Sequence, residues 1–315
     1  MFELFKATTP IRFMKYSKPA SWLSMLLIVV SIASLGINRI NWGLDFTGGT
    51  LIEVGFQQPA VLPEIRETLA QANFSNALAQ HFGSSHEVMI RIPPQDGVKG
   101  VVIGNQVLDA LQAADYGTVD MRRIEFVGPN VGEELAEDGG LAIIIALICI
   151  MIYVSLRFEW RLAAGSVLAL AHDIIITLGV FSIFQLEFDL TVLAALLAVV
   201  GYSLNDTIVV FDRIRENFRL MATSTPDEVV DQSITQTLSR TMITSGTTIF
   251  VLLSLFIVGG ALIHGFSTAL LIGICVGTYS SIYVASALAV NLGVNRDHMI
   301  PEVVEKEGAD QDPLM

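Results

Sequence analysis

Polar side chains interrupt several long apolar segments of this sequence, and they are its best candidates for chemistry. Asp206 lies in the run VGYSLNDTIVVF, directly after Asn205, with Ser203 three positions earlier and Tyr202 four positions earlier. Residues three and four positions apart share one face of a helix. The cluster could hold a carboxylate that takes up and releases a proton, or it could pin two helices together as a purely structural contact.

A second carboxylate, Asp173, follows His172 in another apolar segment. A charged side chain at the centre of a bilayer costs ~2.5–3.5 kcal/mol on insertion scales, so something must offset that cost. Two interpretations stay open for this pair. It could relay protons, or it could be a buried, hydrogen-bonded pair that fixes helix packing.

Arg240 is the third candidate, and its position depends on where a helix begins. Thr225 can cap a helix that has Pro226 in its first turn and Glu228 closing a capping box. If that helix continues into the next apolar segment, Arg240 lies inside the membrane at a depth similar to that of Asp206. If the apolar segment starts a new helix at Thr241, Arg240 only extends to the lipid headgroups.

The apolar segments that carry these residues are long enough to cross a membrane. Hydrophobic residues make up 52% of the 315 residues and charged residues only 16%, against about 25% charged in a soluble domain. A span needs about 20 mostly apolar residues. We therefore expect a polytopic α-helical membrane protein with six transmembrane helices, at residues 22–37, 141–156, 162–186, 190–211, 241–259 and 266–292.

The basic residues of the short connections predict the orientation. Lys and Arg occur in the leader, between spans two and three, after span four and after span six, whereas the other two short connections contain neither. Because basic connections stay in the cytoplasm, we expect both termini there and the large loop after span one outside. That span lacks a convincing cleavage site, which favours an uncleaved anchor over a signal peptide.

The large loop reads as a domain of its own. Six Lys or Arg stand against 14 Asp or Glu in residues 39–138. Alternating and helical patterns predict strands and helices in the order β-α-β-β-α-β, which is typical of a ferredoxin-like domain. The expected organisation is a leader (1–20), a first span (21–38), this domain (39–138), spans two to six with a cytoplasmic loop at 212–239 (139–292), and an acidic cytoplasmic tail (293–315).

Several classes of function lack support in the sequence. The net charge of −13 offers no basic surface for nucleic acid. Cys149 and Cys275 lie in apolar runs, so we expect two buried thiols and no disulfide. Zinc-hydrolase, serine-hydrolase and P-loop motifs are missing, and we expect neither an enzyme nor a bound cofactor or metal. An aspartyl protease using Asp173 and Asp206 is a rival, although neither residue stands in a Gly-x-Gly-Asp context.

Four segments together point to a family. The run GYSLNDTIVVFDRIREN (201–217) resembles the fourth-span signature of the SecF family of bacterial protein-export subunits, within the RND superfamily. WGLDFTGGT (42–50) is similar to the motif that SecF and SecD share at the start of their outer domains. The HD pair (172–173) and SRTMITSGTT (239–248) also fit, and the six-span layout extends the resemblance over the whole chain.

The resemblance implies a function and partners. Members of this family pair with SecD in the inner membrane and work with the SecYEG channel and YajC. They draw unfolded preproteins outward with the ion-motive force, carried by H⁺ or Na⁺. The family's ion-path residues match Asp206 and Arg240, which are expected to form a charge pair that protonation or Na⁺ binding rearranges. With Asp173, Asn205 and Ser203 they make up the predicted ion-coupling site.

Two further rivals remain beside this interpretation. Half of an RND-type small-molecule exporter would share the intramembrane carboxylate, but it usually needs a second large outer loop, which the short connection at 259–265 cannot supply. A non-catalytic scaffold would use the same charges only for packing.

Overall fold

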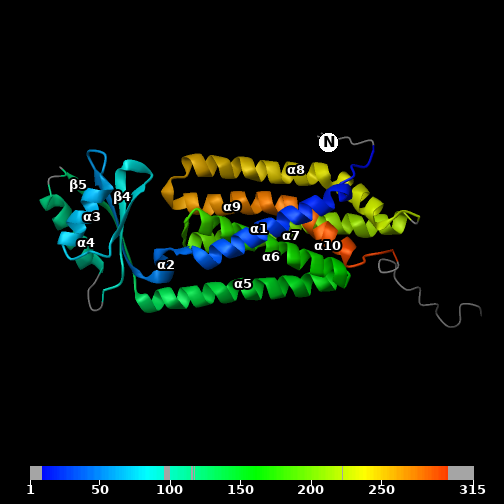
Figure 1. Ribbon diagram of the computed structural model, residues 1–315, viewed down its shortest axis with the longest axis horizontal. Helices are drawn as coiled ribbons and strands as arrows, with labels where there is room; N and C mark the ends of the chain where they lie inside the picture. Colours follow the sequence, from blue (N-terminus) through cyan, green and yellow to red (C-terminus); the bar gives the residue numbers. More distant parts are fainter. Residues whose placement is uncertain (1–8, 96–99, 115, 117, 222, 297–315) are drawn as a thin grey trace, which may run out of the picture.

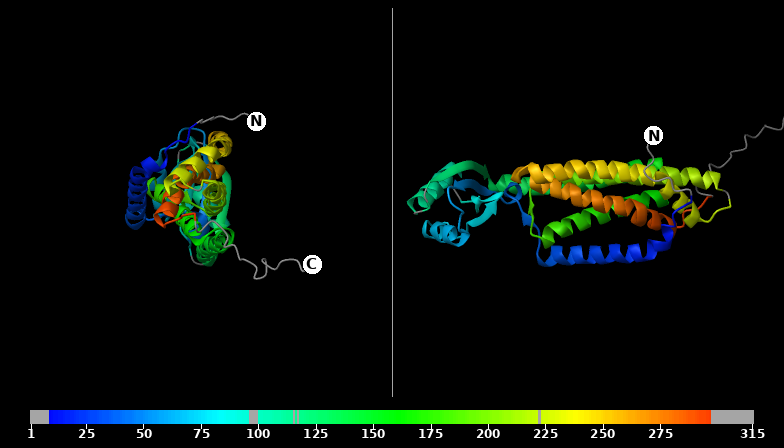
Figure 2. Two further views of the ribbon diagram at one scale, coloured as in Figure 1. Left: turned by 90° about the vertical axis from the view of Figure 1, so that its right-hand side faces the viewer. Right: turned by 90° about the horizontal axis from the view of Figure 1, so that it is seen from above.

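A bundle of long helices carries a small domain of strands and helices at one end in this computed structural model (Figure 1). The structure describes residues 9–95, 100–114, 116, 118–221 and 223–296. Most of the tail expected at 293–315 and the first part of the leader lie outside these residues. Seen end-on and from above, the helices run nearly parallel to the long axis of the molecule (Figure 2).

Six helices in the described residues are long and apolar enough to cross a membrane. The first five are α1 (Ser17–Ile37), α5 (Pro129–Arg157), α6 (Trp160–Ile183), α7 (Leu190–Leu220) and α8 (Pro226–Val258). The sixth span is composite, because α9 (Ala261–Tyr279) leads through a π-helical segment, η2 (Ser280–Ala285), into α10 (Ser286–Asn291).

Two of the expected boundaries differ from the structure. The hydrophobic pattern put the end of the outer domain at residue 138, whereas α5 already begins at Pro129, with Gly128 as an extended cap. The loop expected at 212–239 is almost entirely helical, because α7 continues to Leu220 and α8 starts at Pro226. In both places polar helical turns extend an apolar span, and hydropathy detects only the apolar part.

Helix α8 runs without a break from Pro226 into the fifth span, so no new helix begins at Thr241. The capping box at its start is present. Thr225 Oγ1 accepts the Glu228 N–H at 3.4 Å, and the Glu228 carboxylate accepts the Thr225 N–H at 2.9 Å. Arg240 therefore lies in the middle of one continuous helix.

Helices α6 and α7 form the interior of the bundle, whereas α1, α5 and α8 leave many large apolar side chains exposed. This arrangement suits a membrane, where an apolar side chain gains little by turning away from lipid. It also corrects the expectation for the two cysteines. Cys149 on α5 and Cys275 on α9 are both free and exposed, not buried.

The end domain combines one antiparallel sheet with two helices. Its elements follow in the order β2 (Gly49–Phe56), α3 (Leu62–Gln71), β3 (Leu78–Phe82), β4 (Ser84–Ile92), α4 (Gly100–Ala113) and β5 (Val119–Val127). The strands are arranged as β3-β4-β2-β5. Both helices contribute to a separate core in which Ile52, Ile65 and Val107 are fully buried.

A compact joint connects this domain to the bundle. The two-residue strand β1 (Asn41–Trp42) pairs in parallel with β6 (Glu187–Phe188), which lies between α6 and α7. The short helix α2 (Leu44–Thr47) follows β1, and its Phe46 ring packs against Trp42 and Phe188. The segment after the first span is thus fastened to the turn between the third and fourth spans.

Candidate functional site

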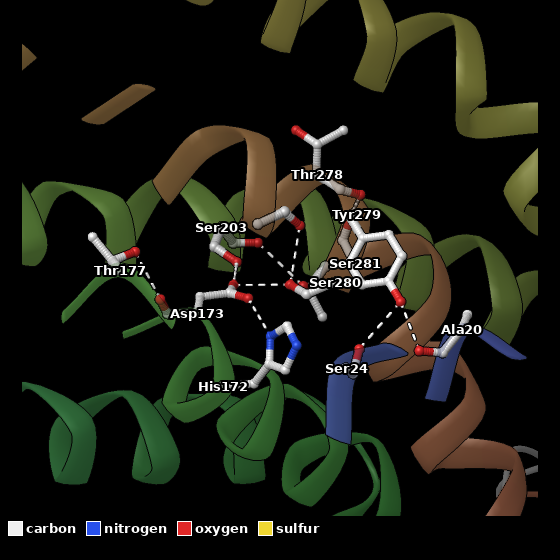
Figure 3. Close-up of polar contacts among 12 residues, drawn as sticks. Ala20, Ser24, His172, Asp173, Thr177, Ser203, Thr278, Tyr279, Ser280 and Ser281 are labelled. Carbon is white, nitrogen blue, oxygen red and sulfur yellow. Dashed lines mark hydrogen bonds and ion pairs between the residues drawn. The ribbon is translucent and has the colours of Figure 1, made fainter. Parts of the chain in front are cut away.

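Asp173 lies at the centre of a buried polar cluster that joins three spans (Figure 3). Its Oδ2 accepts hydrogen bonds from Ser203 of α7 at 2.6 Å and from Ser280 of η2 at 2.8 Å. Its Oδ1 lies 2.9 Å from Nδ1 of the adjacent His172. Asp173 is only 1% exposed, so these three contacts replace the water that a carboxylate needs.

Close approach of the helices makes this cluster possible. A Cβ added at Gly277 would lie 3.0 Å from Cβ of Ser203 and 3.5 Å from the Asp173 carboxylate, so glycine lets the sixth span press against α6 and α7. Ser280 opens the π-helical segment three residues later. Wider π-helical turns are frequent at functional sites, and here the turn carries one of the two serines that bind Asp173.

His172 links the cluster to the first span. Its ring stacks on Tyr279 with the ring centroids 6.5 Å apart. The Tyr279 hydroxyl donates to the Ala20 carbonyl of α1 at 2.8 Å and lies 3.2 Å from the Ser24 hydroxyl (Figure 3). The other ring nitrogen of His172, Nε2, is buried without a partner among the described residues. The cluster thus contacts the helix that leads into the end domain.

Asp206 occupies a separate buried position on α7. It is 3% exposed, and its Oδ2 accepts one long hydrogen bond, at 3.4 Å, from Ser245 of α8. Ser245 also lies 2.8 Å from the Thr278 hydroxyl of α9. Asp173 accepts two short serine bonds and contacts a histidine. Asp206 is therefore the less compensated of the two buried carboxylates.

The five predicted site residues fall into two groups. Asp173, Ser203 and Asp206 are buried, whereas Asn205 and Arg240 are exposed on the surface of the single chain. In the part of the chain that the structure describes, Asp206 and Arg240 form no direct ion pair, although the charge of Arg240 is close enough to act on Asp206. The hydrogen-bond partner of Asp206 on α8 is instead Ser245, which lies five residues after Arg240.

Ser203 binds a different carboxylate from the one its spacing suggested. It stands three residues before Asp206 on α7, but its hydroxyl donates to Asp173 of α6. Tyr202, four residues before Asp206, reaches Thr248 of α8 at 3.4 Å. Helical spacing put these residues on one face of α7, but their hydrogen-bond partners lie on neighbouring helices.

The predicted site did not include several polar residues of the last two spans, although Ser245 lies in the segment 239–248 that carried the family resemblance. These are Ser245 on α8 and Thr278, Tyr279 and Ser280 in the sixth span. A signal was present in the sequence, because four hydroxyl residues in a row, TYSS at 278–281, are unusual in an apolar segment. Hydroxyl side chains in membrane helices commonly bond across to neighbouring helices.

The side chains gathered here have oxygen and nitrogen atoms that can accept protons. No group of three or more His, Cys, Asp or Glu that could hold a metal ion occurs in the described ranges. Two carboxylates, one imidazole and several hydroxyls can accept or pass protons. No hydrogen bond joins the two carboxylates in these ranges, and each has its own partners, which argues against a proton-sharing dyad of the aspartyl-protease type.

Comparison with protein families gives two matches. Residues 106–295 match the family described as protein export membrane protein SecD/SecF, C-terminal. Residues 33–60 match the SecD/SecF GG motif, which includes the β1–α2 joint. The two segments together include every candidate site residue.

Individual proteins extend the comparison to the full chain. Protein translocase subunit SecF of Vibrio alginolyticus is 63% identical over 314 residues, which is 100% of both chains. The SecF subunit of Escherichia coli O157:H7 is 52% identical over 96% of this chain and 94% of its own. The crystal structure of SecDF from Thermus thermophilus superposes with a TM-score of 0.83 at 36% identity, over 92% of this chain and 39% of the longer SecDF chain.

Proposed function

Because this chain belongs to the SecF family of protein translocase subunits, we propose that it is a non-enzymatic subunit that couples ion flow to protein export. It pairs with SecD, as the match to 39% of a joined SecDF chain suggests. With the SecYEG channel and YajC it promotes late steps in the translocation of unfolded preproteins across the bacterial inner membrane. The coupling ion is H⁺ or Na⁺.

The charges at one end of the bundle support the proposed orientation. Arg157 at the end of α5 pairs with Asp212 of α7, and Arg161 of α6 donates to the Leu292 carbonyl beyond α10. These basic residues therefore gather opposite the end domain. The positive-inside rule favours the cytoplasm for this end, which supports the proposal that both termini are cytoplasmic and the end domain is periplasmic. Its element order and its strand order support a ferredoxin-like assignment.

The observation that carries the coupling proposal is the weak compensation of Asp206. A buried, charged carboxylate with one long hydrogen bond is costly unless it is neutralised or paired. Protonation removes the charge, and ionisation favours contact with a cation. Arg240 is the candidate counter-charge on the neighbouring helix α8. In the proposed mechanism the protonated and the ionised form are two states with different contacts between α7 and α8, as coupling needs.

The packing provides routes from this site to the periplasmic domain. Ser245 connects Asp206 to Thr278 of the sixth span, and the neighbouring Tyr279 contacts α1, which enters the domain. A second route runs along α7 to the joint between β1 and β6. One charge crossing 100 mV supplies ~2.3 kcal/mol, which biases a two-state element by more than tenfold.

The test is preprotein export into inverted membrane vesicles that carry Asp206→Asn, with co-purification of SecD as the check on assembly. We expect the complex to form and the part of export that depends on the ion gradient to disappear. Asp138→Asn is the matched control, because that residue is exposed at the outer end of α5, and export should stay normal. If vesicles with Asp206→Asn export preprotein at the wild-type rate, the coupling proposal is wrong and the chain acts as a scaffold.

A further inference from the structure

A shallow hollow of about 400 Å³ lies at the end of the bundle opposite the end domain. It is lined by the side chains of Arg157, Asp212, Arg215, Glu216, Arg219 and Leu220. These residues come from the last turn of α5 and the last turns of α7. The hollow therefore lies at one membrane boundary, where lipid headgroups begin.

Three arginines line this hollow, and two of them, Arg157 and Arg215, both contact Asp212 and the ring of Phe158. Asp212 accepts two bonds from Nη2 of Arg157, at 2.8 and 2.9 Å, and its Oδ1 lies 3.3 Å from Nη2 of Arg215. The ring of Phe158 lies under both guanidinium groups, with its centroid 5.1 Å from Cζ of Arg157 and 5.8 Å from Cζ of Arg215. Cation–π contact and a shared carboxylate therefore hold the guanidinium groups of Arg157 and Arg215 in position.

The charges in the lining leave a positive balance. Arg157 and Arg215 share the single carboxylate of Asp212, and Glu216 is bound at 2.8 Å by Arg213 from outside the lining. A guanidinium has five N–H donors arranged to bind phosphate oxygens in pairs. Asp212 engages only Nη2 of Arg157. Arg215 has Nη2 at Asp212 and donates from Nη1 to the Arg157 carbonyl at 3.4 Å. The lining therefore has the charge and the donors to bind one singly charged phosphate group.

Apolar surface beside the hollow indicates where such a phosphate comes from. Leu220, which lines it, is 71% exposed, and Leu156, directly before Arg157, is 84% exposed. Trp160 is also largely exposed and stacks under Arg161 with 4.7 Å between Cζ and the ring centroid, as expected of an aromatic side chain at a membrane–water interface. A phosphate next to exposed leucines at this level fits a lipid with its acyl chains.

We propose that this hollow binds the phosphodiester headgroup of an anionic phospholipid, with Arg157, Arg215 and Arg219 as its phosphate contacts. Basic pockets between membrane helices on the cytoplasmic side are known to accept such headgroups. One lipid bound there bridges the end of α5 and the end of α7, which carries Asp206. The site is thus independent of the ion-coupling proposal but lies on the same helix.

The full chain in detergent micelles provides the test, with lipid binding counted by native mass spectrometry during titration with phosphatidylglycerol or phosphatidylcholine. Arg219→Gln changes an exposed residue of the lining. We expect the affinity for phosphatidylglycerol to fall about fivefold, because each basic residue near the surface contributes ~1 kcal/mol. The matched control is Arg296→Gln, an exposed arginine that follows the sixth span and does not line the hollow.

Three outcomes separate the alternatives. The proposal is supported if the wild type prefers phosphatidylglycerol and excess inorganic phosphate does not change this preference. It also requires that Arg219→Gln loses the preference and that Arg296→Gln keeps it. Equal losses in both variants would mean a diffuse surface charge and overturn it. Displacement of the lipid by inorganic phosphate would show that the hollow is a site for free anions, which also overturns the lipid assignment.

Discussion

The backbone N–H of Leu190, the first residue of α7, donates to the carboxylate of Asp45 at 2.9 Å. Asp45 belongs to the short helix that follows the first span, whereas α7 carries Asp206. The N-cap of α7 is Asp189, which accepts the Val192 N–H at 2.8 Å. The helix that carries Asp206 thus has a second acceptor at its first turn, a side chain from the entry to the end domain. A shift of α7 reaches that domain through this contact as well as through the spans that enter it.

Replacement of Asp45 by alanine should loosen the first turn of α7, because the Leu190 N–H loses its acceptor while the N-cap Asp189 remains. The first N–H groups of a helix need acceptors, and a negative charge near them is favourable, so the loss should be about 1 kcal/mol. Hydrogen exchange should then become faster in the first turn of α7, measured on the full chain in detergent. Asp120→Ala, at an exposed position of β5, is the control. Equal exchange in the two variants would show that the contact does not hold the helix.

Removal of the Asp173 carboxylate should be costly. Asp173→Ala leaves Ser203, Ser280 and His172 buried without their shared acceptor. Each such group costs about 1–3 kcal/mol, so unfolding in detergent should occur at clearly lower temperature. Asp173→Asn, which keeps the shape and one acceptor, should lose less. If Asp173→Ala unfolds at the same temperature as Asn205→Ala, a variant at an exposed position, the cluster does not contribute to stability.

Close packing of α1 on α6 should make one glycine irreplaceable. A Cβ at Gly179 would lie 2.7 Å from Cα of Ser31, and a helix backbone cannot yield as a side chain can. Gly179→Ala should destabilise the chain by about 1–3 kcal/mol, the usual cost of overpacking. Gly246→Ala on α8 is the matched control, because its Cβ would meet nothing within 4 Å. Similar melting temperatures for both variants would contradict this packing.

The predictability of the fold differs between its parts for a physical reason. The spans follow from hydropathy, since a bilayer demands about 20 apolar residues in a row. The helical turns added at Pro129 and before Leu220 are polar and carry no such signal. The two-residue pairing of β1 with β6 is too short to have a pattern, and only the tertiary fold brings its strands together.

The candidate site shows the same limit. Burial of Asp173 and Asp206 follows from their position in apolar segments, and the structure buries both. Spacing along one helix assigned Ser203 to Asp206, whereas packing gave it to Asp173 on another helix. The exposure of Cys149 and Cys275 was missed because an apolar segment has the same composition whether it faces protein or lipid.

Acidity should strengthen the joint between the end domain and the bundle through Glu187 of β6. Burial raises the pKa of this carboxyl above its ordinary value, the negative charges of Asp189 and Asp45 add to the increase, and Arg91, 3.8 Å away, opposes it. A raised pKa in the folded state means that the contribution to stability is complete below the unfolded value of about 4.3. It is lost as the pH rises through the folded pKa.

Hydrogen exchange at the Gly43 amide, which donates to the Phe188 carbonyl at 2.8 Å, measures the opening of this joint. After correction for the intrinsic pH dependence of exchange, protection in the wild type should fall as the pH rises from about 4 through the folded pKa of Glu187. Glu187→Gln should stay flat over that window, because the amide cannot ionise. Glu137→Gln, at an exposed position on α5, should follow the wild type. A pH profile of Glu187→Gln that matches the wild type would assign the titration to another group at the joint.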